Sequence, residues 1–587
     1  MNAPSSAEAA FSEVQKEYLQ GFAAGLAAGG TLQKGGLGLP GAAPAVEAAP
    51  ADANWFGWPI DEISREEQLK RELNPLDMWD QLLAHARENK PPQGGDVFRF
   101  KFHGLFYVAP AQDSLMVRVR IPGNAMSSAQ MQALAGIAAD LGGGYGDVTT
   151  RGNIQIREIA PRNLVEVLTR LADAALTSRG AGADNVRNIT SSPLSGIDRG
   201  ELIDTRPLAR ALQQYLLNSR DLYGLPRKFN ISFDGAGRVG LATDTNDIGF
   251  VATRVQGGAA VAPGVYFRVL LGGITGHQRF AEDCGLVVGP SECVAVAGAM
   301  LRVFVEHGDR TDRKKARLCH VLDRLGTVRF LELVQAKLGF DLRYVPADQC
   351  SARPPVDKHG HLGIHPQSQP GLSSIGIAIP VGRVQAGQME SLAGLADKFG
   401  SGELRPTVWQ NVVLPNVPDA YVADVVRAIK SIGFDVQAST IAGCVVACTG
   451  NVGCRLSSTD TKGQAVQLSR YLDQRIRLDQ PINLHLTGCP NSCAQHCVAD
   501  IGLLGMQVPQ GDRSVEGYHV YLGGGLEQER GLGREFARNV PFEELPPLLE
   551  RLLLGYQARR VAHESFVDFA RRHEIGALRE LAGVATA

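Results

Sequence analysis

VRVRIPGNAMSSAQMQALAGIAADLG (Val117–Gly142) aligns without gaps with IGIAIPVGRVQAGQMESLAGLADKFG (Ile375–Gly400), 258 positions further along the chain, from 117 to 375. Each copy is followed by a β-type run, DVTTRGNIQIREI or ELRPTVWQNVVLPNV, and then by a helical run, NLVEVLTRLADAAL or AYVADVVRAIKSI. Each copy thus has the order strand, helix, strand, helix, which is typical of an α+β domain. The period is too long for a solenoid. We therefore predict two pseudo-equivalent halves around a shared centre, where ligands often bind.

The bulk composition excludes several classes of protein. The 587 residues carry a formal net charge of −2, so an anion site must be a local basic pocket, and we expect no nucleic-acid partner. No run of 18 apolar residues occurs, so no membrane span is expected. The acidic residues Glu8 and Glu13 stand where a signal peptide has a basic segment, and we expect a cytoplasmic protein.

The cysteines are concentrated in one region. Six of the ten cysteines lie between Cys444 and Cys497, in GCVVACTGNVGCRL and TGCPNSCAQHC. Ten cysteines in so long a chain do not form a disulfide framework, and clustered cysteines in a reducing compartment more often bind metal. Cys444 and Cys497 are expected to be buried core residues.

The remaining four thiols form two pairs, Cys448-x5-Cys454 and Cys489-x3-Cys493. Four thiolates are the number that an iron–sulfur cluster requires. A structural zinc site, which usually uses C-x2-C knuckles, and a packed helical face are the alternatives. Pro490 suits the first turn of a helix capped by Cys489, which would point both sulfurs of the second pair in one direction.

These cysteine motifs resemble those of the nitrite and sulfite reductase haemoprotein family, which contains sirohaem and a 4Fe–4S cluster. DVTTRGNIQIRE, ADNVRN, LPRKFN and the twofold repeat also resemble that family, over about residues 55–580. The resemblance implies an α+β fold of pseudo-twofold halves with both cofactors at their junction. It also implies reduction of nitrite to ammonia, or of sulfite to sulfide, in six one-electron deliveries.

Site residues follow from the same motifs. The resemblance implies that the cluster is ligated by Cys448, Cys454, Cys489 and Cys493, and that Cys493 also bridges to the sirohaem iron. It places in the catalytic anion pocket Arg118, Arg187 and Lys228, where guanidinium and ammonium groups suit a small oxyanion. It assigns to sirohaem binding Arg151, Asn153, Gln155, Arg157 and Arg227.

The resemblance and the composition together predict six segments. They are a flexible extension (1–53), a helical lead-in (54–96), a first ferredoxin-like half-domain (97–180), a sirohaem-binding α+β domain (181–350), a second half-domain (351–432) and an α+β domain with the cluster cysteines (433–587). VFRFKFHGLFYV (97–108) is expected to be β-type throughout.

One position favours nitrite over sulfite as the substrate. Sulfite-reducing relatives commonly have K-x-K after LPR, whereas this chain has Lys228-Phe229-Asn230. Replacing a cation by an amide removes about 1 kcal/mol or more of attraction in a partly buried site, and more for the partly dianionic sulfite. GAGADNVRN also lacks the cysteine that sulfite-reducing relatives tend to have there. Assimilatory sulfite reduction is the alternative.

The chain offers no electron-donor domain of its own. No G-x-G-x-x-G follows a predicted strand, so we expect electrons from a separate small acidic carrier, by resemblance ferredoxin, acting on a monomer. HGDRTDRKKARL (His307–Leu318) is a candidate docking patch for that carrier, and the alternative is a solvated helix start or part of the sirohaem support. A precorrin-modifying monooxygenase and a zinc- or cluster-stabilised binding module are the remaining alternatives.

Overall fold

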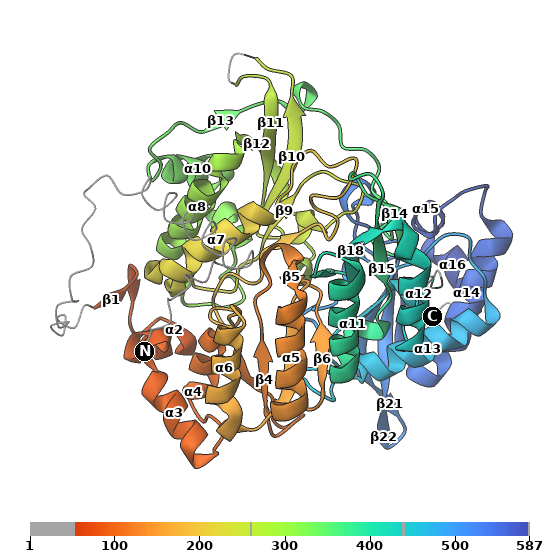
Figure 1. The fold of residues 1–587 in the computed structure, drawn as a ribbon, viewed down its shortest axis with the longest axis horizontal. Helices are drawn as coiled ribbons and strands as arrows, with labels where there is room; N and C mark the ends of the chain where they lie inside the picture. Colours follow the sequence, from red (N-terminus) through yellow and green to blue (C-terminus); the bar gives the residue numbers. More distant parts are fainter. Residues whose placement is uncertain (1–52, 259–260, 437–438, 440, 585–587) are drawn as a thin grey trace, which may run out of the picture.

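The structure, a computed structural model, describes residues 53–258, 261–436, 439 and 441–584 (Figure 1). Except for Ala53, the predicted N-terminal extension lies outside the described residues. Helices and sheets alternate along the chain, and the mixed α+β class predicted from the sequence is confirmed. Among the described residues, no helix combines the length and the apolar character needed to cross a membrane.

The internal repeat is reproduced element by element. Helix α5 (Ser128–Leu141) corresponds to α11 (Ala386–Phe399), and α6 (Leu164–Asp173) to α12 (Val422–Ser431), each pair 258 positions apart as in the sequence. α5 and α11 pack side by side at the centre of the molecule (Figure 1). Both begin in the same way, because a glutamine in the first turn accepts a hydrogen bond from the backbone N–H of the capping residue.

Two five-stranded sheets carry these helices. The first has the order β16-β6-β7-β4-β3 and consists of β3 (Leu105–Tyr107), β4 (Leu115–Arg118), β6 (Tyr145–Val148), β7 (Ile154–Ile159) and β16 (Arg383–Gln385). The second has the order β14-β15-β18-β17-β5 and consists of β5 (Met126–Ser127), β14 (Gly363–Pro366), β15 (Leu372–Ile377), β17 (Glu403–Pro406) and β18 (Val412–Pro418).

The two halves exchange a strand. β16 comes from the second copy of the repeat but pairs with β6 of the first, Val384 opposite Gly146. β5 comes from the first copy but pairs with β17 of the second, Leu404 opposite Met126. One continuous hydrophobic core lies beneath both sheets, with residues such as Leu134 and Leu392 fully buried. The halves therefore form one packed unit.

Two larger sheets flank this unit. The six-stranded sheet has the order β13-β12-β11-β10-β9-β8 and consists of β8 (Thr190–Ser191), β9 (Ile231–Asp234), β10 (Ile248–Val255), β11 (Gly264–Leu271), β12 (Glu282–Val288) and β13 (Arg343–Tyr344). Its core includes α7 (Arg206–Asn218), α8 (Cys293–His307), α9 (Leu318–Leu325) and α10 (Thr327–Gln335).

The second flanking sheet has the order β19-β20-β21-β22-β23. It consists of β19 (Val445–Ala447), β20 (Leu484–Thr487), β21 (Ile501–Gln510), β22 (Arg513–Leu522) and β23 (Arg534–Pro541). Its core includes α13 (Thr461–Arg475), α14 (Leu545–Arg559), α15 (Phe566–Arg572) and α16 (Ile575–Ala582). The strands β19, β20 and β21 run parallel, so the loops that leave β19 and β20 emerge at the same edge of the sheet.

The structure of the lead-in and of the residues that follow it contradicts one prediction. It consists of β1 (Asn54–Trp55), β2 (Trp58–Pro59), α2 (Arg65–Glu72), α3 (Trp79–Glu88) and α4 (Asp96–Arg99). Residues 97–108 were expected to be β-type throughout, but helical turns continue to His103 and only β3 is a strand. The Arg99 side chain donates to the carbonyl of Leu69 (3.0 Å), and this buried tertiary contact outweighs the alternating pattern.

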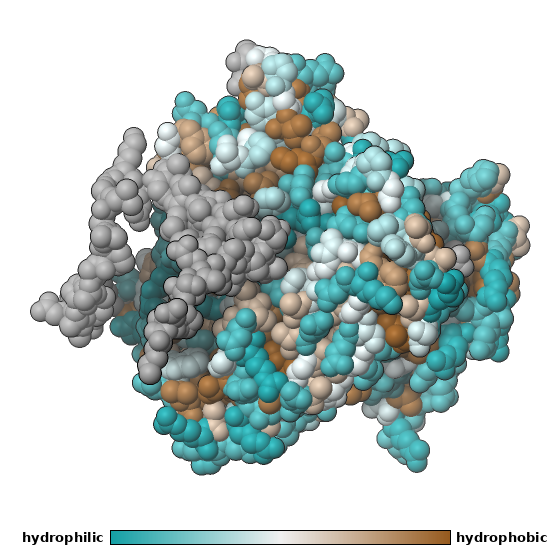
Figure 2. All heavy atoms as spheres, in the orientation of Figure 1, coloured by the Kyte–Doolittle hydropathy of each residue, from teal (hydrophilic) through white to brown (hydrophobic). Residues whose placement is uncertain are grey.

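The surface shows no single dominant character. On the face drawn in Figure 2, hydrophilic residues cover most of the area above the C-terminal helices, and hydrophobic residues form scattered groups. Such scattering is normal for a globular protein. The functional site must therefore be located from the arrangement of particular side chains.

Candidate active site

The first pair of cysteines lies in the loop that follows β19. The backbone N–H of Cys448 donates to the carbonyl of Leu486, so this loop begins against β20. The N–H of Gly488 donates to the Cys448 sulfur at 3.2 Å. Arg157 reaches the loop from the first half of the molecule, donating to the carbonyl of Gly453 (3.0 Å) and to the Thr449 hydroxyl (2.9 Å). The position of Cys454 is thereby fixed from a distant part of the chain.

The second pair of cysteines lies in the loop after β20, which forms turns rather than the predicted helix. Ser492 has φ of 51°, a left-handed conformation that ends any right-handed turn begun at Pro490. The N–H of Ala494 donates to the Thr487 hydroxyl (3.2 Å) instead of to a helical carbonyl. The loop is tied to the first half of the molecule, since the Thr150 hydroxyl donates to the carbonyl of Cys493 (3.1 Å).

The four thiols gather at one place. Burial raises the pKa of the Cys493 thiol to about 11, and the neighbouring Cys448, Cys489 and Cys454 raise it further. Burial also raises the pKa of Cys489, with contributions from Cys448 and Cys454. Nevertheless, within the described part of the chain no three His, Cys, Asp or Glu side chains are close enough to hold a single metal ion. Four thiols that act on one another in this way match the number of ligands that an iron–sulfur cluster requires.

The other two cysteines of this region behave as predicted. Cys444 and Cys497 are 5% and 2% exposed, so neither is free to act as a fifth ligand without rearrangement. The Cys497 thiol donates to the carbonyl of Thr275 (3.2 Å). All ten cysteines of the chain are free thiols.

Three cations lie beside Cys493: Arg118 and Lys228 are within electrostatic reach of its sulfur, and Arg187 is next to Arg118. Arg118 and Arg187 both donate to the carbonyl of Ala181, at 3.3 and 2.7 Å, so their guanidinium groups lie next to each other. Lys228 is close enough to Cys493 for each to shift the pKa of the other. Within the described residues, no carboxylate lies within 4.0 Å of the charged nitrogens of these three residues. Unpaired cations around one sulfur are typical of an anion site.

Burial sets the charges of this site. Arg118, Arg187 and Lys228 are half-buried, whereas Cys493 is exposed, so the four line a recess with access to solvent. Burial, together with the nearby charge of Arg317, lowers the pKa of Lys228 to about 7. Burial lowers the pKa of Arg118 to about 10. A bound anion would stabilise all three charges, which is the electrostatic reason for an anion to bind there.

The residues predicted for sirohaem fall into two groups. Arg151 is half-buried and donates to the Asn246 side chain (2.9 Å) and to the carbonyls of Asn188 (2.7 Å) and Ile231 (3.1 Å), whereas Arg227 is half-buried and lies 3.9 Å from Asp184. The other three, Asn153, Gln155 and Arg157, are buried and already hydrogen-bonded within the protein. Asn153 and Arg157 donate to protein atoms, and the Gln155 side-chain oxygen accepts a hydrogen bond from Arg157, so these contacts hold this stretch of the chain in place.

Sequence reasoning missed two cations of the same recess. Burial lowers the pKa of Lys101, and Arg455 and Arg187 lower it further, so these three positive charges lie close together. Arg455 directly follows Cys454 in the sequence and is exposed. The sequence signal that could have identified Arg455 was its position directly after Cys454, one of the four predicted cluster ligands. Lys101 gave none, because its segment was interpreted as a strand.

The three arginines of the basic segment 307–318 are paired with carboxylates of the protein. Arg310 pairs with Glu67 (2.8 Å), Arg313 with Asp184 (2.8 Å) and Arg317 with Asp247 (2.6 Å). Only its two lysines, Lys314 and Lys315, are exposed. The contacts favour the second of the two interpretations offered for this segment, support of the cofactor site, over a docking patch.

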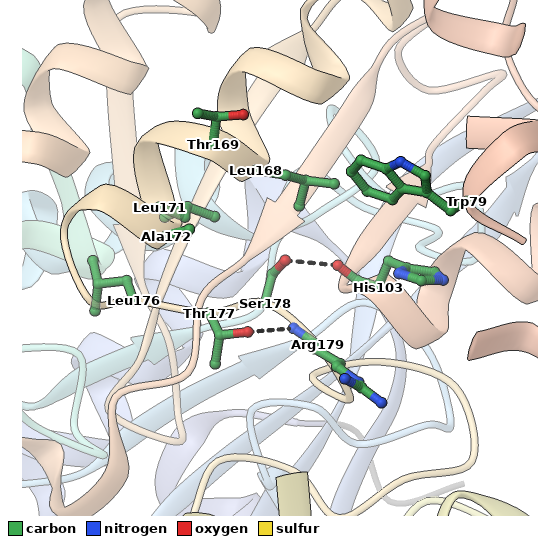
Figure 3. Close-up of a pocket in the computed structure, with 10 residues that line it drawn as sticks. All are labelled: Trp79, His103, Leu168, Thr169, Leu171, Ala172, Leu176, Thr177, Ser178 and Arg179. Carbon is green, nitrogen blue, oxygen red and sulfur yellow. Dashed lines mark hydrogen bonds between the residues drawn. The ribbon is translucent and has the colours of Figure 1, made fainter. Parts of the chain in front are cut away.

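A separate cavity of about 370 Å³ lies away from this recess (Figure 3). Its wall consists of side chains from α3, from α6 and from the residues that follow α6, among them Trp79, Leu168 and Arg179. The Ser178 hydroxyl donates to the carbonyl of His103 at 2.7 Å within it. The lining contains no cysteine and none of the predicted site residues, so the cavity is not the predicted active site.

The comparison with known protein families decides the assignment. The domain described as "Nitrite and sulphite reductase 4Fe-4S domain" matches residues 182–342 and 443–584. The domain described as "Nitrite/Sulfite reductase ferredoxin-like half domain" matches residues 108–174 and 365–432. The chain belongs to the nitrite and sulfite reductase family. The predicted family, fold and cofactors, sirohaem with a 4Fe–4S cluster, are thereby confirmed.

Individual relatives match most of this chain and most of their own length. The chain is 35% identical over 516 residues to the ferredoxin–nitrite reductase of Synechococcus elongatus, covering 85% of this chain and 98% of the relative. It is 35% identical over 472 residues to the chloroplastic ferredoxin–nitrite reductase of Zea mays, covering 78% and 81%. Its fold is similar to that of the Mycobacterium tuberculosis NirA protein, with a TM-score of 0.82 at 28% identity, covering 88% and 98%.

The contact between the two cysteine loops yields the first prediction. A Cβ atom on Gly488 would lie 1.7 Å from the Ser457 hydroxyl and 2.9 Å from the Ser457 Cβ, too close for rotation of the serine to relieve. We expect Gly488→Ala to destabilise the protein by about 1–3 kcal/mol. It should also lower the iron and acid-labile sulfide bound per chain, measured in the purified protein. Gly387→Ala, where a Cβ meets nothing within 4 Å, is the control. Equal cluster content in the two variants would contradict the prediction.

Proposed function

We propose that this chain reduces nitrite to ammonia with six electrons from reduced ferredoxin. One observation carries the proposal beyond family membership: Arg118, Arg187 and Lys228 form a cationic group beside Cys493, and no carboxylate of the described residues lies within 4.0 Å of their charged nitrogens. Relatives named ferredoxin–nitrite reductase occur in cyanobacteria and plants. A relative from the archaeon Haloferax mediterranei is named assimilatory ferredoxin-dependent nitrite reductase.

We assign the cluster ligands to Cys448, Cys454, Cys489 and Cys493. The mutual electrostatic influence of these thiols, which lie in two loops at the same edge of one sheet, supports the assignment. Iron favours the thiolate form and would lower the raised thiol pKa values. Arg227, which is half-buried and 3.9 Å from Asp184, is proposed to hold a sirohaem carboxylate. When bound, sirohaem supplies the iron to which nitrite coordinates and through which it receives electrons.

The protein's own side chains are proposed to bind and protonate the substrate. Arg118 and Arg187 share the carbonyl of Ala181, so their free N–H groups are held in one orientation to grip the two oxygens of nitrite. Lys228 is the only one of the three that can release a proton near neutral pH, because guanidinium groups stay charged. Lys228 is therefore assigned to proton delivery at the departing oxygens.

Partner and location follow from the same proposal. A small acidic electron carrier such as ferredoxin is proposed as the donor, and a monomer in the cytoplasm as the working form. The ten free thiols support a reducing compartment. The domain boundaries given above remain a prediction.

The function is tested by steady-state rates with one reduced donor and either nitrite or sulfite. We expect the wild-type holoenzyme to prefer nitrite. Asn230→Lys should raise the ratio of the sulfite rate to the nitrite rate about fivefold, because a second cation adds about 1 kcal/mol of attraction, and more for a dianion. Asn230 lies half-buried and is held by its backbone N–H donating to Asp247 (2.8 Å). A wild-type preference for sulfite would refute the proposal, and an unchanged ratio in the variant would refute the role of Asn230.

A further inference from the structure

Arg118 of the proposed anion site packs against an aromatic ring. Its guanidinium carbon lies 4.5 Å from the centre of the Phe106 ring, within the range of a cation–π contact. β3 and β4 pair antiparallel with Phe106 opposite Met116, and alternation along β4 places Arg118 on the same face of the sheet as Met116. Phe106 and Arg118 are therefore diagonal neighbours across the strand pair, a position from which long side chains reach one another.

Two glycines make room for this contact. Gly104 lies across from Arg118, since the N–H of Arg118 donates to its carbonyl (2.9 Å), and it places no side chain beside the arginine. At the tip of the ring, a Cβ atom on Gly182 would lie 2.6 Å from Cζ of Phe106, closer than such atoms approach in proteins. A side chain at position 182 would therefore push the ring out of place.

The ring holds Arg118 without neutralising it. Among the described residues, the guanidinium donates to the carbonyl of Ala181 at 3.3 Å, and no carboxylate lies within 4.0 Å of it. By contrast, Arg157 on the neighbouring strand β7 is paired with Asp147 at 3.2 Å. A carboxylate partner would cancel most of the positive charge, whereas the face of an aromatic ring attracts a cation and carries no net charge. The charge of Arg118 thus stays available to an anion.

A holding contact is needed because Arg118 has another cation next to it. Arg187 donates to the same carbonyl of Ala181 at 2.7 Å, so two positive charges lie side by side before any anion binds. Like charges repel, and the bond made by Arg118, at 3.3 Å, is the longer and weaker of the two. The contact with Phe106 supplies the restraint that this bond lacks.

We propose that Phe106 is a positioning residue for the anion site, an inference that rests on the proposed function. The ring face fixes the plane of the Arg118 guanidinium, so its free N–H groups have their binding orientation before nitrite arrives. Such preorganisation lowers the cost of binding. Phe106 has no group that gives or takes a proton, so it acts on the affinity for the anion and not on the chemical steps.

The contact is tested in the holoenzyme by removing the ring and by weakening its face alone. Phe106→Leu should raise both the KM for nitrite and the Kd, measured from the optical spectrum of the oxidised holoenzyme, by about fivefold, with kcat little changed. Mono-, di- and trifluorinated phenylalanine at position 106 keep the shape of the ring while withdrawing negative charge from its face. The Kd should rise along this series, which a purely structural role would not cause. The fluorinated proteins also serve as the test if the leucine variant does not fold.

A double variant and a matched control complete the experiment. In an Arg118→Met background, Phe106→Leu should cause no further loss of affinity, because both residues act through one contact. Phe399→Leu is the control, since the Lys398 ammonium nitrogen lies 4.8 Å from the centre of that ring and neither residue belongs to the site.

Three results would each overturn the inference. They are a Phe106→Leu variant with the Kd and KM of the control, a fluorinated series with constant Kd, and additive losses in the double variant. Wild-type turnover of nitrite tests the proposed function separately, so the two failures are distinguishable.

Discussion

Replacing Cys493 by serine is expected to abolish nitrite reduction. The serine hydroxyl stays protonated at neutral pH and is a poor ligand for iron, whereas a thiolate is a strong one. Lys228 and Arg118 of the proposed anion site also both respond to the charge of Cys493. The loss should exceed the roughly 10- to 100-fold that outer-shell changes cause at metal sites. Turnover with reduced donor, iron and sulfide content, and the optical spectrum of the purified variant measure it.

Cys497→Ser is the matched control for this experiment. Cys497 lies in the same loop region but is buried, and its thiol already donates to the carbonyl of Thr275, which a serine hydroxyl can also do. We expect the Cys497→Ser variant to retain its cluster and most of its turnover. Nitrite reduction by Cys493→Ser at the rate of this control would exclude Cys493 as a ligand.

Lys228→Met is expected to lose between about 10²- and 10⁴-fold in kcat, the range typical of a general acid. Methionine retains the length of the side chain and removes both the charge and the proton. The optical spectrum should be unchanged, because Lys228 is not among the proposed cofactor ligands. Rates on nitrite and spectra of the same preparation measure the two quantities together.

Two comparison variants separate charge from proton transfer at this position. Lys228→Arg keeps the positive charge but holds its proton, so we expect nitrite binding to persist and kcat to stay low. Lys314→Met removes an exposed lysine of the basic segment and should have little effect. A Lys228→Arg variant with wild-type kcat would assign Lys228 to binding alone.

Much of this fold could be predicted from the internal repeat. Helices α5 and α11 start and end at matching positions because the same apolar residues recur there, and apolar periodicity is a local signal. The turn at Ser492 was not readable, since its left-handed backbone depends on the hydrogen bond between Ala494 and Thr487, a contact made only after β20 has formed. The helix predicted from Pro490 failed for that reason.

The roles of the site residues remain predictions, and the contacts that some of them make could not be predicted from the sequence. The resemblance assigned Arg157 to sirohaem, whereas its guanidinium is engaged by Asp147, Gly453 and Thr449. Which arginines are free and which are bound depends on long-range pairing, and the sequence does not encode such pairing in any local pattern. The same holds for Lys101, which only the folded chain brings next to Arg187.

The exchange of β5 and β16 has a consequence for how this chain originated and how it can be divided. Each repeat completes its neighbour's sheet, so a fragment ending between the copies would expose an unpaired edge on β6 or β17. An ancestral single copy could have met the same need by dimerising with an identical copy, and fusion of two genes would then have preserved the mutual pairing. Cutting the polypeptide between the copies should yield pieces that are soluble only when co-expressed.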